Sequence, residues 1–265
     1  MASLNFIFGL LGNLTTGLVY LSPAKTFWHI VQRRSTEEFE SIPYISKLLN
    51  AYFWVWYGIV KPNSVLVASV NGFGAALEII YVIIFLIFAP PMMRGRTAVL
   101  AGVCDVVFPG TTVLVTQIFF DRDVQIKVSG FLSLCFSMVA YSSPLSAMYI
   151  QKFSPFHKIV VALTLEMKMQ KTVVVTKSVE YMPFLLSFIL FINGAVWTVY
   201  AVLTKDLFIG IPNGSGFILG TAQLVLYAMY WKPKSSSKKS LDDASEDGWQ
   251  HERLISADNP EKREG

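Results

Sequence analysis

The chain has 265 residues, of which 53% are hydrophobic and only 15% are charged, and its mean hydropathy is +0.50. This composition is too apolar for an ordinary soluble domain and predicts helices that lie in a lipid bilayer. The net charge of +4 gives no indication of nucleic-acid binding, and we expect none. Cys104 and Cys135 lie inside apolar runs, so we interpret them as buried small side chains and expect neither a metal nor a cofactor.

Seven apolar segments are long enough, or nearly so, to cross a hydrocarbon core of about 30 Å. They span residues 6–22, 43–60, 66–88, 97–118, 129–149, 183–203 and 209–231. No Lys or Arg precedes Lys25, so the first segment lacks the basic region of a signal peptide and we interpret it as a span. From Lys232 onward the composition turns polar and charged, which predicts a disordered tail over 232–265.

The distribution of positive charge predicts the orientation. If the N-terminus faces away from the cytosol, 17 of the 22 Lys and Arg residues fall in cytosolic loops or the tail, and four fall on the other side. This asymmetry favours an odd number of spans with a cytosolic C-terminus. We interpret the remaining cation, Lys47 in the second span, as a residue that snorkels to the membrane surface.

The second half of the chain repeats motifs of the first half in the same order. Four pairs of motifs recur: "SPAKTF" at 22–27 with "SPLSAM" at 143–148, Pro43 with Pro183, N-x3-W-x2-Y from Asn50 with the same pattern from Asn193, and N-G-x-G from Asn71 with that from Asn213. Four pairs in one order are too many for coincidence, and they indicate a duplicated bundle.

Both units start on the same side of the membrane, so the repeats are parallel and need an unpaired helix between them. We therefore predict an all-α membrane protein of seven transmembrane helices, arranged as three plus one plus three. The expected domains are a first three-helix repeat at 5–88, a linker helix at 97–118 and a second repeat at 129–231.

These motifs resemble those of the SWEET sugar facilitators of plants, across about residues 5–231. The resemblance is carried by "LSPAKTFWHIVQRRSTEEFESIPY", "WVWYG", "SVNGFG", "SPLSAM", "TKSVEYMPF" and "IPNGSGF". It implies a bidirectional uniporter for a mono- or disaccharide, with alternating access and a homo-oligomeric assembly. Because "RRSTEEFE" and "TKSVEYMPF" look most like the vacuolar-type subgroup, it also implies the vacuolar membrane (tonoplast) rather than the plasma membrane.

A sugar needs hydrogen bonds for its hydroxyls and an apolar surface for its ring. Asn both donates and accepts, and Trp offers a broad face. The positions that line the family's central cavity give six predicted sugar-binding residues: Asn50, Trp54, Asn71, Asn193, Trp197 and Asn213. Many relatives have a smaller residue at the position of Asn50, which favours monosaccharides such as fructose or glucose here. The competing interpretations are an Asn that only bonds a neighbouring helix and a Trp of the interfacial belt.

Two further sets of residues are predicted to move during transport. The resemblance implies a hinge and inner gate formed by Pro23, Pro43, Pro144 and Pro183. It also implies an outer gate in which the Tyr57 hydroxyl pairs with Asp206. On sequence alone Asp206 is equally a residue that caps the last helix.

Two ionisable residues lie within the spans. Glu78 and Asp105 are either a proton relay or carboxyls that brace helix contacts. A relay would fit the alternative function, a proton-coupled exporter of a small solute or amino acid. No catalytic motif is present, so we do not expect an enzyme. Finally, residues 149–170 form an apparent insertion between the fifth and sixth spans.

Overall fold

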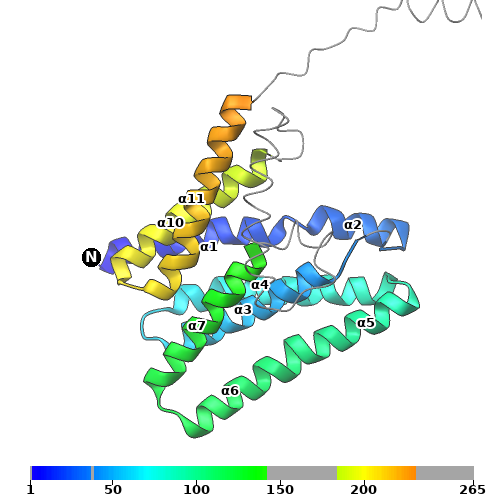
Figure 1. Cartoon of the computed structure of the whole chain (residues 1–265), viewed down its shortest axis with the longest axis horizontal. Helices are drawn as coiled ribbons and strands as arrows, with labels where there is room; N and C mark the ends of the chain where they lie inside the picture. Colours follow the sequence, from blue (N-terminus) through cyan, green and yellow to red (C-terminus); the bar gives the residue numbers. More distant parts are fainter. Residues whose placement is uncertain (1, 37–38, 142–183, 231–265) are drawn as a thin grey trace, which may run out of the picture. The chain divides into compact units, whose positions relative to one another are not determined.

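The computed structural model describes residues 2–36, 39–141 and 184–230 (Figure 1). Within these ranges the chain is helical and contains no strand, which confirms the all-α prediction. The helices are α1 (Ala2–Leu21), α2 (Ala24–Arg33), α3 (Ile42–Val60), α4 (Val65–Phe88), α5 (Pro91–Ala101), the π-helical segment η1 (Gly102–Val107), α6 (Phe108–Phe119), α7 (Arg122–Tyr141), α10 (Phe184–Thr204) and α11 (Leu207–Tyr230). Pro144, Pro183, the insertion at 149–170 and the tail at 232–265 lie outside the described residues.

Four stretches of helix in the described part are long and apolar enough to cross a membrane. They are Leu4–Arg33, Val65–Phe88, Pro91–Phe119 and Leu207–Met229. Helix α3 is 19 residues long but carries Lys47 and Asn50, and α10 contributes a shorter apolar stretch, Phe188–Thr204. Both polar side chains line the cavity described below, so the lower hydropathy of α3 reflects a surface that faces the interior of the protein.

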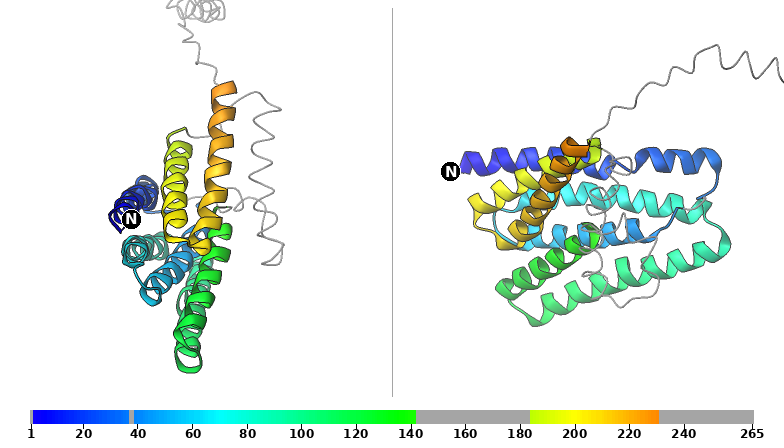
Figure 2. Two further views of the ribbon diagram at one scale, coloured as in Figure 1. Left: turned by 90° about the vertical axis from the view of Figure 1, so that its left-hand side faces the viewer. Right: turned by 45° about the horizontal axis from the view of Figure 1, so that its top comes forward.

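Six helices pack in a closed order in which each contacts the next (Figures 1 and 2). The order is α4, α1, α10, α11, α7, α3 and back to α4. If the two repeats are exchanged, so that α1 replaces α7, α3 replaces α10 and α4 replaces α11, the order maps onto itself. Helices α5 and α6 with η1 lie outside this ring, against α3, α4 and α7. This is the predicted arrangement of two parallel three-helix bundles with a linker helix.

Close helix contacts repeat in the same way. Gly9 on α1 and Gly130 on α7 lie 121 residues apart, the separation of the two Ser-Pro pairs that follow. A Cβ added at Gly9 would lie 2.5 Å from the nearest side chain, and one added at Gly130 would lie 2.6 Å away. The obstructing side chains are themselves repeat equivalents: Leu66 and Tyr200 at Gly9, Phe208 and Tyr57 at Gly130. Small residues of this kind let helices approach closely in a membrane.

Helix α2 was not predicted from the sequence. Pro23 ends α1 because it cannot continue the hydrogen-bond ladder, and the chain then starts a second helix at Ala24. Phe27 and Ile30 are buried on one face of α2, against α4. A spacing of three residues puts both side chains on the same face, so the segment after the first span is an amphipathic helix rather than a loop.

The linker is longer than predicted, since helix begins at Pro91 rather than at residue 97. Its middle turn is η1, where the Phe108 N–H bonds the Val103 carbonyl five residues earlier. Pro109 follows directly. A proline has no N–H and clashes with the carbonyl four residues before it, and a π turn widens the helix enough to accommodate this. Similarly, α7 begins at Arg122, earlier than the predicted start of the fifth span at residue 129.

Candidate functional site

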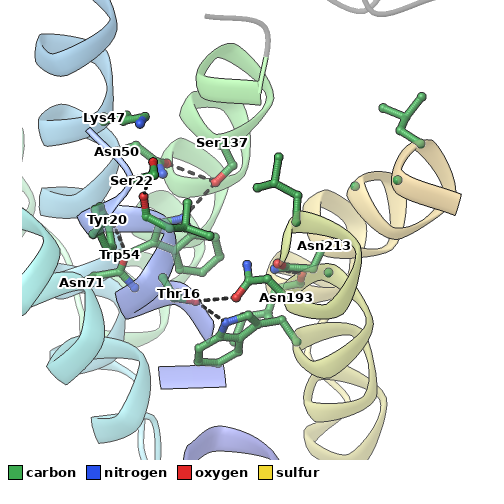
Figure 3. Close-up of a pocket in the computed structure, with 18 of the residues that line it drawn as sticks. Thr16, Tyr20, Ser22, Lys47, Asn50, Trp54, Asn71, Ser137, Asn193 and Asn213 are labelled. Atoms are coloured by element: carbon green, nitrogen blue, oxygen red, sulfur yellow. Dashed lines mark hydrogen bonds between the residues drawn. The ribbon is translucent and has the colours of Figure 1, made fainter. Parts of the chain in front are cut away.

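A cavity of about 270 Å³ lies inside the ring, and all six ring helices contribute to its wall (Figure 3). Ligand pockets run from about 300 to 1,000 Å³, so this cavity suits a small ligand. Six of the lining residues are those predicted to bind sugar: Asn50, Trp54, Asn71, Asn193, Trp197 and Asn213. The structure therefore brings the six together, while their role in binding stays a prediction.

The first half of the cavity holds a short chain of hydrogen bonds. The indole N–H of Trp54 donates to the Ser137 hydroxyl at 2.9 Å, and that hydroxyl donates to Oδ1 of Asn50 at 3.1 Å. Asn50 and Trp54 lie one turn apart on α3, so they share a face, whereas Ser137 belongs to α7. One hydroxyl of the second repeat thus holds two residues of the first.

The second half of the cavity repeats this pattern. The indole N–H of Trp197 donates to the Thr16 hydroxyl at 2.8 Å, and Thr16 donates to Oδ1 of Asn193 at 2.7 Å (Figure 3). The Thr15 hydroxyl also lies 2.8 Å from the same amide oxygen. Thr16 and Ser137 are 121 residues apart, so they are repeat equivalents. Sequence analysis missed both, although the offset between "SPAKTF" and "SPLSAM" would have identified them.

Asn71 and Asn213 occupy equivalent positions on α4 and α11. The amide Nδ2 of Asn71 donates to the Val67 carbonyl at 2.9 Å, and that of Asn213 donates to the Ile209 carbonyl at 2.8 Å. Oδ1 of Asn71 accepts a hydrogen bond from the Tyr20 hydroxyl at 2.9 Å. Each amide is therefore anchored to its own helix, one turn back, and keeps a second N–H for another acceptor.

The structure changes the interpretation of Lys47. Its side chain lines the cavity, a position that sequence analysis did not predict (Figure 3). It lies ten residues before Tyr57 on α3, about 15 Å along the helix. Among the described residues, Lys47 is the only cation in the cavity wall, and no Asp or Glu lines it. A proton-coupled carrier needs a titrating carboxylate in its cavity, so the site does not support the alternative function.

Glu78 on α4 and Asp105 in the linker segment η1 do not line the cavity. Glu78 is fully buried and Asp105 is 6% exposed. None of their four carboxylate oxygens has a hydrogen-bond partner among the described residues. The bracing hydrogen bonds considered from the sequence are therefore not seen in that part of the chain.

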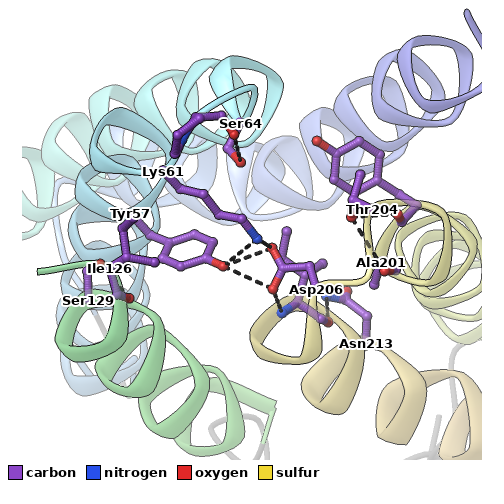
Figure 4. A network of polar contacts seen from close by, with 12 residues as sticks. Tyr57, Lys61, Ser64, Ile126, Ser129, Ala201, Thr204, Asp206 and Asn213 are labelled. Atoms are coloured by element: carbon purple, nitrogen blue, oxygen red, sulfur yellow. Dashed lines mark hydrogen bonds and ion pairs between the residues drawn. The ribbon is translucent and has the colours of Figure 1, made fainter. Parts of the chain in front are cut away.

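The predicted outer gate is closed (Figure 4). The Tyr57 hydroxyl lies 2.9 and 2.8 Å from the two carboxylate oxygens of Asp206. Tyr57 is completely buried, and Asp206 is 5% exposed. Oδ1 of Asp206 also accepts from the Ile209 N–H at 3.2 Å, so this carboxylate both caps α11 and bonds Tyr57. The two interpretations from the sequence are compatible.

A lysine joins this Tyr57–Asp206 contact, and sequence analysis missed it. The Lys61 ammonium donates to the Tyr57 hydroxyl at 2.9 Å and forms an ion pair with Asp206. Lys61 follows α3 and Asp206 precedes α11, so the pair joins the two repeats. Below the gate, a cluster of buried residues from both repeats closes this end of the cavity: Trp54, Tyr57, Val67, Val70, Trp197, Tyr200, Ala201 and Ile209.

The predicted proline hinge is described only in part. Pro23 is the N-cap of α2, at the break after α1, and Pro43 lies in the first turn of α3. Proline is well tolerated in a first turn, where its missing N–H has no partner in the helix. Neither position is a helix interior, and their function as a hinge stays a prediction.

A ring of two parallel repeats around one cavity, closed at one end and lined by Asn and Trp side chains of both repeats, is the architecture of a small membrane carrier. Residues 6–92 and 159–235 match the MtN3_slv family model, described as "Sugar efflux transporter for intercellular exchange". The chain is 46% identical to bidirectional sugar transporter SWEET17 of Arabidopsis thaliana over 88% of each chain. It is equally identical to SWEET16 of the same plant, over 87% of this chain and 91% of that relative.

A solved structure agrees with the sequence comparisons. A eukaryotic SWEET transporter determined at 3.7 Å resolution superposes with a TM-score of 0.73 and 33% sequence identity, covering 86% of this chain and 96% of that one. The chain therefore belongs to the SWEET family of membrane sugar transporters. Membership in a family of transporters also bears out the expectation that it is not an enzyme.

Proposed function

We propose that this protein lets a hexose cross the membrane in both directions, down its gradient, by alternating access through the central cavity. One observation carries the proposal: the Asn and Trp side chains of both repeats converge on a single cavity whose one end is closed by Tyr57, Lys61 and Asp206. A carrier must present its site to one side at a time, and a gate of breakable polar contacts between two repeats suits that requirement.

The chemistry of the wall fits a neutral polyol. Asn71 and Asn213 each keep an amide N–H beyond the one bonded to the helix backbone, and these can donate to sugar hydroxyls. The rings of Trp54 and Trp197 offer apolar surface for the sugar ring. A cavity of about 270 Å³ with Asn50 in its wall favours a monosaccharide over sucrose.

The charge distribution supports an orientation for this cycle. With a cytosolic C-terminus, the gate lies on the non-cytosolic side, and the end near Lys47 lies toward the cytosol.

We assign the protein to the vacuolar membrane because its motifs resemble the vacuolar-type subgroup, and a homo-oligomeric assembly follows from the same resemblance. An image of a fluorescent fusion tests the location, since signal at the plasma membrane would contradict it.

Uptake into proteoliposomes tests the transport proposal. Purified protein should equilibrate labelled glucose or fructose faster than empty liposomes do, and sucrose more slowly than either hexose. Vesicles preloaded with unlabelled hexose should take up labelled hexose faster at first, because a bidirectional carrier exchanges its substrate. Hexose uptake no faster than in empty liposomes would overturn the proposal.

A further inference from the structure

The two tryptophans of the cavity are held by the repeat to which they do not belong. Trp54 on α3 donates to Ser137 on α7, and Trp197 on α10 donates to Thr16 on α1. In the packing order of the ring, α3 contacts α7 and α1 contacts α10. These are the two contacts between the repeats that the exchange of repeats interconverts. The two hydrogen bonds therefore both cross between the repeats. In one the first repeat supplies the indole donor, and in the other the second repeat does.

We propose that Thr16 and Ser137 are reciprocal positioning residues, each of which fixes the indole and the amide of the opposite repeat's half of the cavity. A hydroxyl has one proton and two acceptor lone pairs. Each of these hydroxyls gives its proton to an Asn oxygen and accepts an indole proton. Little hydrogen-bonding capacity is left for a ligand, so the two hydroxyls act through the residues they hold.

This arrangement also fixes which way two amides face. Oδ1 of Asn50 accepts from Ser137, and Oδ1 of Asn193 accepts from Thr16 and Thr15. The orientation of an amide is set by its hydrogen-bond network, and here the oxygens point at the hydroxyls. The NH₂ groups of Asn50 and Asn193 are thereby left to act as donors toward a hydroxyl oxygen in the cavity. In Figure 3 the oxygen of each amide points to its hydroxyl partner.

The two halves differ in one respect. Asn193 has a second hydroxyl partner, Thr15, whereas Ser137 alone holds Asn50 among the described residues. Loss of the Ser137 hydroxyl thus releases both members of its half-site. Loss of the Thr16 hydroxyl releases Trp197 but leaves Asn193 bonded to Thr15. The structure accordingly assigns a larger effect to Ser137.

Indole NMR of the sugar-free protein tests the positioning directly. The chain has six Trp residues, and ¹⁵N-labelled Trp gives one indole N–H signal for each, with Trp54 and Trp197 assigned by Trp→Phe substitution. Thr16→Val, which replaces the hydroxyl by a methyl of similar size, should move the Trp197 signal and leave Trp54 in place. Ser137→Ala should do the reverse. Thr16→Ser and Ser137→Thr, which keep the hydroxyl, should leave both signals close to those of the native protein.

A crossed pattern supports the proposal, because a general loss of structure would move both signals together. Three outcomes would overturn it. In these, each hydroxyl-free variant shifts the signal of the Trp in its own repeat, shifts both Trp signals, or shifts neither. Should Ser137→Ala not yield folded protein, the Thr16→Val and Thr16→Ser pair alone decides the question.

Transport supplies the second readout, and this part rests on the proposed function. One lost hydrogen bond to a positioned group changes affinity about two- to tenfold, so the glucose KM should rise by about that factor in Thr16→Val and by more in Ser137→Ala. Thr16→Ser should stay within about twofold of the native KM. A native KM in both hydroxyl-free variants would overturn the inference. If the native protein moves no glucose, the proposed function fails, while the NMR pattern still decides the positioning.

Discussion

Tyr57 and Asp206 are 149 residues apart in the chain, yet the tyrosine hydroxyl lies within 2.9 Å of both carboxylate oxygens. The contact joins the end of α3 in the first repeat to the start of α11 in the second. Lys61 adds an ion pair to the same carboxylate. This end of the cavity is therefore closed by contacts between the repeats, which must break for it to open.

A graded series at Asp206 tests the gate. Asp206→Asn keeps an oxygen that can accept from the Tyr57 hydroxyl and the Ile209 N–H, but it loses the charge that pairs with Lys61. Asp206→Ala removes all three contacts. We expect hexose flux to fall in Asp206→Asn and to fall further in Asp206→Ala, because a gate that does not close leaves the cycle incomplete. Equal flux in all three proteins would show that this contact is not a gate.

The positive charge of Lys61 is expected to support hexose flux, because it pairs with Asp206. Lys61→Met removes the ammonium and keeps much of the stem, so flux should fall severalfold, since charge-assisted bonds are worth roughly twice neutral ones. Lys205 provides a matched control, as it is exposed and directly precedes Asp206. Lys205→Met should transport at close to the native rate. Similar losses in both variants would mean that general surface charge, rather than the gate, is responsible.

Asn213→Ala is expected to abolish hexose transport while the protein still reaches the membrane. A site that relies on hydrogen bonds to substrate hydroxyls loses heavily when one polar partner is removed. Asn13 on α1 is a suitable control, because it is an Asn of a membrane helix that does not line the cavity. Flux is measured in vesicles that contain matched amounts of protein. Near-native flux in Asn213→Ala would contradict the site assignment.

Asn50 is expected to restrict the size of the substrate. Asn50→Ser shortens a side chain in the cavity wall next to Ser137. The ratio of sucrose uptake to glucose uptake should therefore rise, even if glucose uptake itself falls. Competition between the two sugars in one vesicle preparation gives this ratio directly. An unchanged ratio would show that Asn50 does not set the preference.

Gly74 is expected to tolerate no side chain. A Cβ at this position would lie 2.1 Å from the Tyr20 ring, and Tyr20 is the residue that bonds Asn71. Gly74→Ala should lower the melting temperature and weaken transport together. Gly72→Ala, two residues away in the same helix, meets nothing within 4 Å and should leave both unchanged or stabilise slightly, because Gly is the poorer helix former.

Most of the fold could be predicted because apolar length and duplication are strong signals. The predicted span at 43–60 agrees with α3 at Ile42–Val60, and that at 66–88 agrees with α4 at Val65–Phe88. The predicted helix boundaries were wrong where polar segments of the sequence form helix. Helix α2 was missed because its polar face obscures the buried pair Phe27 and Ile30. The linker was predicted to start at residue 97, whereas Pro91 already starts a helix.

The candidate site was predicted less evenly. The six Asn and Trp residues converge because the duplication places each set at the same depth in its own repeat. Thr16 and Ser137 were overlooked because a single hydroxyl in an apolar helix usually bonds its own backbone. Lys61 could not be found from the repeat, because the predicted gate is not duplicated. The residue equivalent to Asp206 in the first repeat is Ser64, 142 positions earlier, which has no carboxylate.

The central claim is that the cavity carries a hexose without coupling to protons, and one measurement tests it most directly. Labelled glucose uptake is followed in proteoliposomes with and without an imposed pH gradient, for the native protein and for Asn213→Ala. We predict that the native protein equilibrates glucose to the same final level and at a similar rate under both conditions, and that Asn213→Ala does not. Glucose accumulation above equilibrium, or uptake that requires the gradient, would contradict the account.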